Sequence, residues 1–356
     1  MAVETPCGEF RTSYAAERSI FRTRNSARAA LLGILVAAAA PALVNSYFIS
    51  ILIQIGYFSI AALGLNVLVG LSGQISIGHA AFYGFGGFAS VFISSRLGVP
   101  VPLSVLLAGF VTSAAGLIFA LPALRIKGLY LAIATLAAQA ILEDFFARAG
   151  WFTGGASGVL ANPYEMFGFA FDSDRSYYYV VLAHLLAALL LVSNLQRTRV
   201  GRAFVAVRDH YLSAEMMGIN LAEYRLLAFL VAAFFAGIGG ALQAHYLQFV
   251  SIEGITLMLS VQFLAMIIIG GLGSVSGTVM GATFIVLLPQ VLNCIVTRAS
   301  ELLHLSFNLV GSLPLIREMA TGLAIMLFLA LEPEGLARRW RRIKTYWKVY
   351  PFGYQS

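Results

Sequence analysis

The chain has 356 residues, of which 60% are hydrophobic and 11% are charged, with a formal net charge of +7 at pH 7. A soluble globular domain carries about 25% charged residues, and a disordered chain combines low hydrophobicity with high net charge, so this composition excludes both classes. Two cysteines, Cys7 and Cys294, are too few for a disulfide framework or a thiolate metal cluster. The composition is typical of an integral membrane protein.

Long runs without charged residues predict that the membrane spans are helices. Between Arg28 and Arg96 there are 67 consecutive residues without Asp, Glu, Lys or Arg, and residues 254–297 form a second such run. A spanning helix needs about 20 apolar residues, whereas a barrel strand needs about 10 residues of alternating polarity. These runs do not alternate. We therefore expect an all-α polytopic membrane protein.

The chain divides into about ten predicted transmembrane helices. They lie at residues 29–45, 47–70, 79–97, 101–121, 128–147, 177–195, 225–246, 254–271, 276–294 and 314–332. Glycines 270, 271, 273 and 277 supply the break between the eighth and ninth spans. Arg317 and Glu318 intrude on the last span, so nine or eleven helices remain alternatives. Ten spans also fit an inverted repeat that relates spans two to five to spans seven to ten.

The distribution of Lys and Arg predicts that both termini are cytoplasmic. With the N-terminus inside, 18 of the 23 basic residues lie on inside segments or at their edge, as the positive-inside rule requires. The predicted organisation is an N-terminal cytoplasmic segment 1–28, a transmembrane domain 29–332 with a long inside loop 196–224, and a basic tail 333–356. Tyr346, Trp347 and Tyr350 give that tail two open interpretations, an amphipathic interfacial end or a solvated tail.

A first group of small and polar residues follows the second span. Ser72, Gly73, Gln74 and Ser76 lie in this segment, and His79 follows it. Such residues at membrane depth either line a path through a broken helix or let helices pack closely. Both interpretations stay open for the segment. A single histidine such as His79 is more typical of a hydrogen-bonded structural residue.

A second segment, Gly270–Gly277, resembles the first in its spacing of small residues and lies between two apolar runs. It contains Gly271 and Ser274, which we group with the first segment as candidate residues of a translocation path or gate.

The inside loop 196–224 contains a predicted amphipathic helix at residues 201–218. Phe204, Val207, Tyr211 and Ala214 recur at helical spacing, and Gly218 suits a helix end. Its candidate functional residues are Gly201, Arg202, Arg208, Asp209, Glu215 and Gly218. A helix resting on lipid would be more purely basic, so the mixed charges favour contact with a cytosolic partner.

An enzymatic interpretation attaches to Gly155–Gly158, which matches the Gly-x-Ser-Gly pattern of rhomboid-type intramembrane serine proteases, with His184 or His245 as the base for Ser157. The residues after Ser157 are those of an external loop, whereas such a protease needs its serine in a buried helix. We predict no catalytic residue, no metal site and no cofactor bound by this chain.

The order of motifs resembles the permease subunits of bacterial branched-chain amino acid ABC importers of the LivM type. The matching stretches are Gly64–Gly70, Gly73, Ser76, Gly78–Phe82, Leu124–Tyr130, Thr135–Leu136, Thr153–Gly158, Gly201–Asp209, Ala214–Gly218, Ala236–Ala241, Ile269–Gly277 and Glu332–Gly335. Together they cover most of residues 60–335.

This resemblance implies a multi-pass subunit of the bacterial inner membrane that forms a pore with a homologous second permease. It also implies two cytosolic ATPase subunits, which would hold ATP and Mg, and a periplasmic substrate-binding protein. No nucleic acid is expected as a partner. The loop resembling Gly201–Gly218 would be the coupling segment that fits a groove of the ATPase. The substrate is a branched-chain or other amino acid, or a related small polar solute.

An ion-coupled secondary transporter is the main alternative function. Such a carrier is expected to place ionisable groups in the middle of its spans. Glu143 and Asp144 lie near the outer end of the fifth span, and no carboxylate occupies a span centre. This distribution favours a transport subunit whose energy comes from ATP bound elsewhere.

Overall fold

Residues 24–123, 128–166, 168–302 and 335–349, with isolated positions between 319 and 330, are described by a computed structural model. The N-terminal residues 1–23, most of the predicted span 314–332 and residues 350–356 lie outside this part of the chain. The proposed domain boundaries near both termini therefore stay predictions. Within the described ranges the chain is almost wholly helical, which confirms the all-α fold class.

The helices run in an order close to the predicted one. In chain order the elements are α2 (Arg24–Leu43), α3 (Ser46–Leu65), η1 (Asn66–Leu71), α4 (His79–Arg96), α5 (Val101–Ala123), α6 (Leu129–Arg148), α7 (Gly150–Thr153), η2 (Gly155–Ser157), β1 (Val159–Leu160), β2 (Glu165–Met166), β3 (Phe169–Ala170), α8 (Asp174–Leu195), α9 (Arg199–Asp209), α10 (Tyr211–Met216), α11 (Leu221–Leu247), β4 (Phe249–Val250), η3 (Ile252–Gly254), α12 (Leu257–Gly270), α13 (Val275–Leu302) and α15 (Gly335–Val349). The predicted break near Gly271 separates α12 from α13 as expected.

Seven helices in the described residues are long and apolar enough to cross a membrane. They are 46–71, 101–121, 130–148, 174–195, 221–247, 252–270 and 275–294, and each coincides with a predicted span. Two other predicted spans form helices that do not meet this criterion. In α2 the apolar part, Arg28–Leu43, is too short, and α4 is rich in glycine and polar residues. Because α4 is buried among other helices, it needs no apolar surface for lipid.

The core lies where α3, α4 and α5 pack around α11. Glycines allow this close approach. A side chain at Gly86 would collide with the backbone of Gly237, and one at Gly240 would collide with the backbone of Tyr83. We call the contact of Gly86 and Gly87 with Gly237 and Gly240 the glycine seam. It lets two backbones meet directly, as in other membrane helix pairs rich in small residues.

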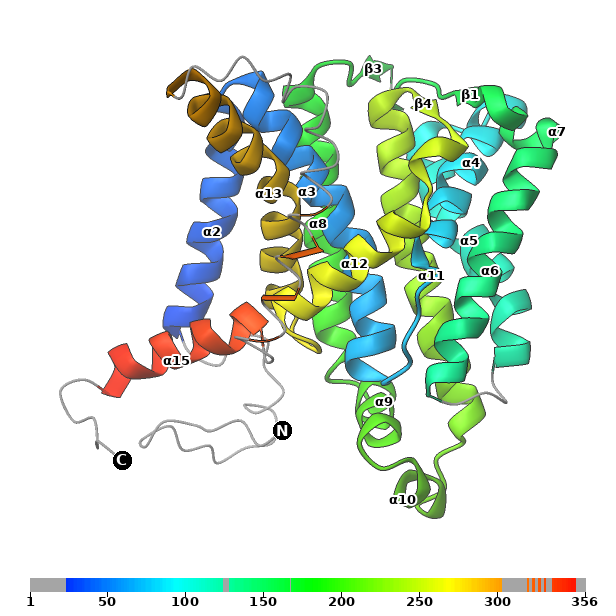
Figure 1. The fold of residues 1–356 in the computed structure, drawn as a ribbon, viewed down its shortest axis with the longest axis vertical. Coiled ribbons are helices and arrows are strands. Elements are labelled where there is room, and N and C mark those ends of the chain that lie inside the picture. The colour runs from blue at the N-terminus through cyan, green and yellow to red at the C-terminus, as the bar shows by residue number, and fades with distance from the viewer. Residues whose placement is uncertain are drawn as a thin grey trace.

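The short elements lie at the two ends of the bundle. Figure 1 shows α9, α10 and α15 at one end, and α7 with the small strands at the opposite end. At that opposite end β1 pairs antiparallel with β4, with Val159 beside Val250, and β2 pairs with β3. The first pair ties the loop before α8 to the end of α11.

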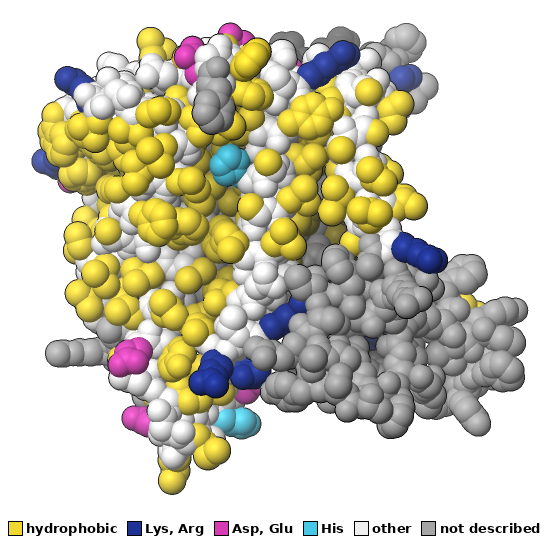
Figure 2. Space-filling view, turned by 180° about the vertical axis from the view of Figure 1, so that it is seen from behind, with side chains coloured by type: hydrophobic (Ala, Val, Ile, Leu, Met, Phe, Trp, Pro, Cys, Tyr) yellow, Lys and Arg dark blue, Asp and Glu magenta, His cyan; other side chains and the backbone are white. Residues whose placement is uncertain are grey.

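The type of exposed side chain also changes from one end of the bundle to the other. On the face seen in Figure 2, hydrophobic side chains cover the middle of the molecule, and charged side chains gather near its two ends. An apolar belt between two charged ends is the surface that a bilayer requires of a polytopic protein.

The glycine seam predicts that a Gly→Ala substitution lowers thermal stability within the seam and does not lower it at an open glycine elsewhere. Gly240→Ala adds a methyl group that meets the fixed backbone of Tyr83, whereas Gly33→Ala in α2 adds one where nothing lies within 4 Å. Overpacking costs about 1–3 kcal/mol, and Ala improves an open helix position by about 1 kcal/mol. We expect the detergent-solubilised Gly240→Ala protein to melt at a lower temperature and the Gly33→Ala control to match or exceed the parent. Equal melting temperatures in the two variants would contradict the seam.

Candidate functional site

The segment 72–78, which joins η1 to α4, has no regular secondary structure, and its residues alternate between buried and exposed from Ser72 to Ser76. Ser72, Gln74 and Ser76 are buried, whereas Gly73 and Ile75 are exposed. The Gln74 amide donates to the Ser72 hydroxyl over 2.7 Å and to the Arg225 carbonyl over 3.1 Å. The predicted polar residues therefore face neighbouring helices in this conformation, and the exposed side belongs to Gly73 and Ile75.

His79 begins α4 and is also buried. Its Nε2 lies 2.9 Å from the carbonyl oxygen of Ala61, and because a carbonyl only accepts, Nε2 carries the hydrogen. The ring packs edge-on against Phe263, with centroids 5.5 Å apart. Both contacts fit the structural interpretation of this histidine.

The first amides of α4 have side-chain partners from two distant helices. Ala80 N donates to the Ser260 hydroxyl of α12 over 2.8 Å, and Ala81 N donates to Gln139 Oε1 of α6 over 2.9 Å. Ser260 itself donates to Gln139. The opening amides of a helix have no partner within the helix, so these contacts allow α4 to begin among apolar neighbours.

Gln139 and Ser260 escaped the sequence analysis because they belong to no motif in their spans. Their polarity within apolar segments was the available signal, since hydrocarbon penalises unpaired polar groups and such residues face the protein interior. Gln139 also donates to Glu143 Oε1 over 2.7 Å. A half-buried carboxylate is thus linked by hydrogen bonds to the start of α4.

The turn between α12 and α13 is bound to η1 by one side chain. Asn66 donates from Nδ2 to the Ser274 carbonyl over 3.2 Å and accepts at Oδ1 from the Gly273 amide over 2.8 Å. η1 is a π-helix, a form that often marks functional positions. Asn66 is buried, so this pair of bonds fixes the turn that contains Gly271 and Ser274 to the end of α3.

The inside loop folds as two helices rather than the single one predicted for residues 201–218. The Thr198 hydroxyl accepts from Gly201 N and starts α9, which ends where His210 adopts an extended conformation, and α10 follows. Phe204, Val207 and Ala214 are buried as their spacing predicts. Gly218 has φ +83°, which confirms that a left-handed residue ends the loop helix.

The charged candidates on these helices differ in exposure. Arg202, Asp209 and Glu215 are exposed, and Arg208 is partly buried. The Arg208 guanidinium is 2.8 Å from Asp209 Oδ1. Its hydrogen bond lowers the pKa of Asp209, so the carboxylate stays ionised at a lower pH than an ordinary Asp does. The stability that this contact contributes is lost only as the pH falls through the lowered pKa.

Arg208 joins the two groups of candidates that the sequence analysis treated separately. Its Nη1 donates to the Gly70 carbonyl over 2.6 Å, and its side-chain carbons lie against Gly73. Gln196, just before α9, donates to the Gly273 carbonyl over 3.2 Å. We call the set Asn66, Gly70, Arg208, Gly273 and Ser274 the junction. There α9 meets both glycine-containing breaks.

The enzymatic interpretation finds no support in the geometry. Ser157 lies in the short η2 helix of the loop at the end of the bundle opposite α9. His184 Nδ1 pairs with the Val180 carbonyl, while His245 pairs with the Asn162 carbonyl and the Ser90 hydroxyl. These histidine ring contacts do not involve Ser157.

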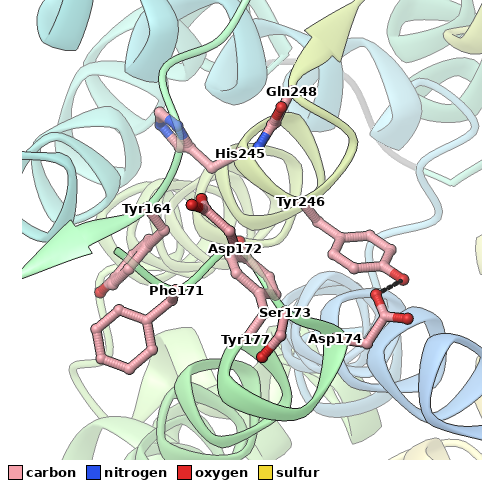
Figure 3. Close-up of a pocket in the computed structure, with 9 residues that line it drawn as sticks. All are labelled: Tyr164, Phe171, Asp172, Ser173, Asp174, Tyr177, His245, Tyr246 and Gln248. Carbon is pink, nitrogen blue, oxygen red and sulfur yellow. Dashed lines mark hydrogen bonds between the residues drawn. The ribbon is translucent and has the colours of Figure 1, made fainter. Parts of the chain in front are cut away.

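A small cavity of about 50 Å³ lies at that same end (Figure 3). Nine residues line it: Tyr164, Phe171, Asp172, Ser173, Asp174, Tyr177, His245, Tyr246 and Gln248. The Tyr246 hydroxyl points at Asp174 and donates to it over 3.1 Å. Burial raises the pKa of Tyr164 to about 12, so its phenol stays protonated at neutral pH. The cavity is too small for an amino acid, since ligand sites typically enclose about 300 Å³ or more.

Comparison with known proteins identifies relatives across most of the chain. The family described as the branched-chain amino acid transport system / permease component matches residues 47–330. The high-affinity branched-chain amino acid transport system permease protein LivM of Salmonella typhimurium is 32% identical over 281 residues, which cover 72% of this chain and 66% of LivM. LivM of Escherichia coli is 31% identical over the same shares.

A second permease, LivH of Salmonella typhimurium, is 23% identical over 246 residues, which cover 63% of this chain and 78% of LivH. The matched region thus spans slightly less than two thirds of the LivM relatives. No solved structure matches this chain significantly.

The junction predicts that Asn66 stabilises the fold more than a surface asparagine does. Asn66→Ala removes both bonds and leaves the Gly273 amide without its partner, a loss of about 1–3 kcal/mol. Asn45→Ala is the matched control, because Asn45 makes no side-chain cap bond at the start of α3. We expect thermal unfolding in detergent to shift downward for Asn66→Ala and little for Asn45→Ala. Equal shifts of the unfolding temperature in the two variants would show that the bonds of Asn66 do not stabilise the fold.

Proposed function

This chain belongs to the family of branched-chain amino acid transport permease components, and we propose that it is the transmembrane permease subunit of an ATP-binding cassette importer. It would form the translocation path for branched-chain or other amino acids, or for a related small polar solute. The similarity to LivM and LivH supports this assignment. The junction carries it physically, because it connects the exposed loop helix α9 to both breaks in the bundle.

The proposed assembly contains partners beyond this chain. A homologous second permease would complete the pore, two cytosolic ATPase subunits would bind ATP and Mg, and a periplasmic binding protein would deliver substrate. In this arrangement the end with α9, α10 and α15 faces the cytoplasm of a bacterium, across its inner membrane. The basic residues Arg197, Arg199, Arg202 and Arg208 near that end support this orientation.

We extend the proposal to ten transmembrane helices with an inverted repeat and both termini in the cytoplasm. The breaks support the repeat. α3 and η1 are followed by the irregular segment 72–78 and the shorter α4, and α11 is followed by residues 248–256 and the shorter α12 of 14 residues. Interrupted helices at corresponding positions of two halves are typical of transporters.

The exposed side of segment 72–78 is the proposed lining of the path. Non-helical backbone at membrane depth is tolerated where protein covers it or water reaches it, because lipid cannot form hydrogen bonds with its amides and carbonyls. Gly73 and Ile75 therefore face either the conduit or the second permease along it. Ser72, Gln74, Ser76 and His79 support the shape of this lining from behind.

Coupling would pass through Arg208. The ATPase would bind α9 and α10, where Arg202, Asp209 and Glu215 are exposed. A movement of α9 pulls on the Gly70 carbonyl through the guanidinium, and Asn66 carries the displacement from η1 to the α12–α13 turn. A single contact chain thus links the ATPase surface to both breaks, with Gly271 and Ser274 at its far end.

The first test removes the link between α9 and η1. Arg208→Ala deletes a charge-assisted hydrogen bond worth about 1.5–3 kcal/mol. We expect the reconstituted complex to assemble and hydrolyse ATP while substrate uptake per ATP falls by about tenfold or more. Arg175→Ala, an exposed change at the other end, is the control. Normal uptake in the Arg208 variant would show that this loop is an ordinary surface connection.

A second test separates this function from the ion-coupled alternative, which would depend on Glu143. Glu143→Gln removes the charge and keeps an oxygen that can accept from Gln139. We expect ATP-driven uptake to remain within about twofold of the parent. Uptake driven by a proton or sodium gradient without ATP, and abolished in this variant, would favour the alternative carrier.

A third test examines the lining. Ile75→Cys places a thiol on the exposed side of the segment, and Ser76→Cys places one on the buried side. We expect a membrane-permeant thiol reagent to modify Ile75→Cys faster by about tenfold, because thiolate access governs the rate. In the assembled complex, nucleotides that close the path should slow this modification. Equal rates at the two positions would exclude the proposed lining.

A further inference from the structure

The helix α15 lies outside the bundle and has no role in the contacts described so far. Figure 1 shows it running across the end of the spans, on the side where α9 and α10 lie. Its first turn is fixed to the α12–α13 turn. Gly335 has φ +73° and rests against Gly271, and the buried Ala337 contacts Gly277.

The sequence of α15 is amphipathic. Leu336, Trp340 and Ile343 recur at positions i, i+4 and i+7, which places them along one stripe of a helix. The rest of the helix carries Arg338, Arg339, Arg341, Arg342, Lys344 and Lys348, and α15 contains no acidic residue. With six basic residues in 15, this helix cannot span a bilayer.

The stripe has a defined direction. Leu336 packs against the core of the spans, so the face that contains it looks toward the membrane-spanning part of the molecule. Further along that face Trp340 remains 60% exposed and Ile343 remains 46% exposed. These two side chains lie on the same side of α15 as Leu336, and the described residues of the chain leave them largely uncovered.

From this geometry we propose that α15 lies in the headgroup layer of the membrane, with Trp340 and Ile343 inserted at the interface and its basic face bound to anionic phospholipid headgroups. A helix with an apolar stripe, a purely cationic polar face and Trp at the boundary has the chemistry of an interfacial helix. The mixed charges of α9 and α10, with Asp209 and Glu215, lack that character and suit a protein partner instead. Two kinds of surface helix therefore lie at one end of the bundle.

The position of the apolar stripe of α15 favours lipid over an acidic protein as its binding partner. A cytosolic protein docked on the stripe would have to enter the level of the bilayer beside α12 and α13, because Leu336 already holds that face against them. Lipid occupies this level without any rearrangement. The proposal does not depend on the transported substrate.

The test uses the fluorescence of Trp340 in the full chain. Trp151→Phe and Trp347→Phe leave one tryptophan, because the sequence contains three. The protein is reconstituted in vesicles of phosphatidylcholine alone or of phosphatidylcholine with phosphatidylglycerol. We expect blue-shifted emission, quenching by brominated lipid and protection from acrylamide in the anionic vesicles, with protection weakened by high salt because exposed charges are screened.

Matched charge variants then separate headgroup binding from simple burial. Arg342→Gln with Lys344→Gln removes two charges from α15, and Arg96→Gln with Arg175→Gln removes two from the opposite end. We expect the first pair to raise the phosphatidylglycerol content needed for half protection by roughly tenfold, and the second to leave it unchanged. A melting curve for each variant confirms that it is folded.

Two results would overturn the proposal. Equal access of acrylamide to Trp340 in neutral and anionic vesicles would show that the helix is solvated. Protection that appears only when the ATPase subunits are added would show that the stripe is a protein-docking surface.

Discussion

Every break in a transmembrane helix leaves amides and carbonyls that lipid cannot satisfy, and the arrangement of this protein depends on how those groups are paired. Gln139 and Ser260 receive the first amides of α4. Asn66 holds both a donor and an acceptor of the α12–α13 turn, and Arg208 occupies the carbonyl of Gly70. Polar side chains thus pair the backbone groups that are left where helical hydrogen bonding stops, and these contacts hold the breaks in place.

Pairing the backbone groups at the breaks also requires the helices to pack closely. A side chain can reach an unpaired backbone group in a neighbouring helix only if the two helices approach closely. The glycine seam brings α4 against α11, and Gly70 lies directly against Gly273. Small residues and single polar residues thus work as pairs, since one permits the distance that the other requires.

Much of the fold could be predicted from the sequence, because each membrane span appears as a continuous run of apolar residues without charge. The charge-free runs gave the positions of the spans, and the glycines near 271 gave the break between α12 and α13. The partners at the junction could not be predicted in this way. Asn66 and Ser274 are 208 positions apart, and Arg208 and Gly70 are 138 apart, so neither contact leaves a local pattern.

Smaller differences have similar causes. The loop helix was expected to be continuous, but it breaks at His210, a residue with no strong turn signal. The span predicted at residues 79–97 forms α4, which is surrounded by other helices, and that environment is a property of the assembled bundle. The assignment of the polar candidates Ser72, Gln74 and Ser76 to a path or gate stays a prediction. Their burial could not be predicted, because it depends on which side of the irregular segment 72–78 other helices cover.

The composition of α4 has a consequence for the order of synthesis and assembly. Because α4 contains His79, Arg96, three glycines and three serines, its mean hydropathy is below that of the seven spanning helices, and it gains less than they do from entering the bilayer as an independent segment during translation. Its stabilising neighbours are synthesised later: Gln139 follows it by about one further span, and Ser260 emerges more than 160 residues after its last residue, Arg96. The ribosome must therefore have completed α12 before the start of α4 can acquire its full set of partners. Packing around the start of α4 is thus completed late, after the second half of the chain has been synthesised.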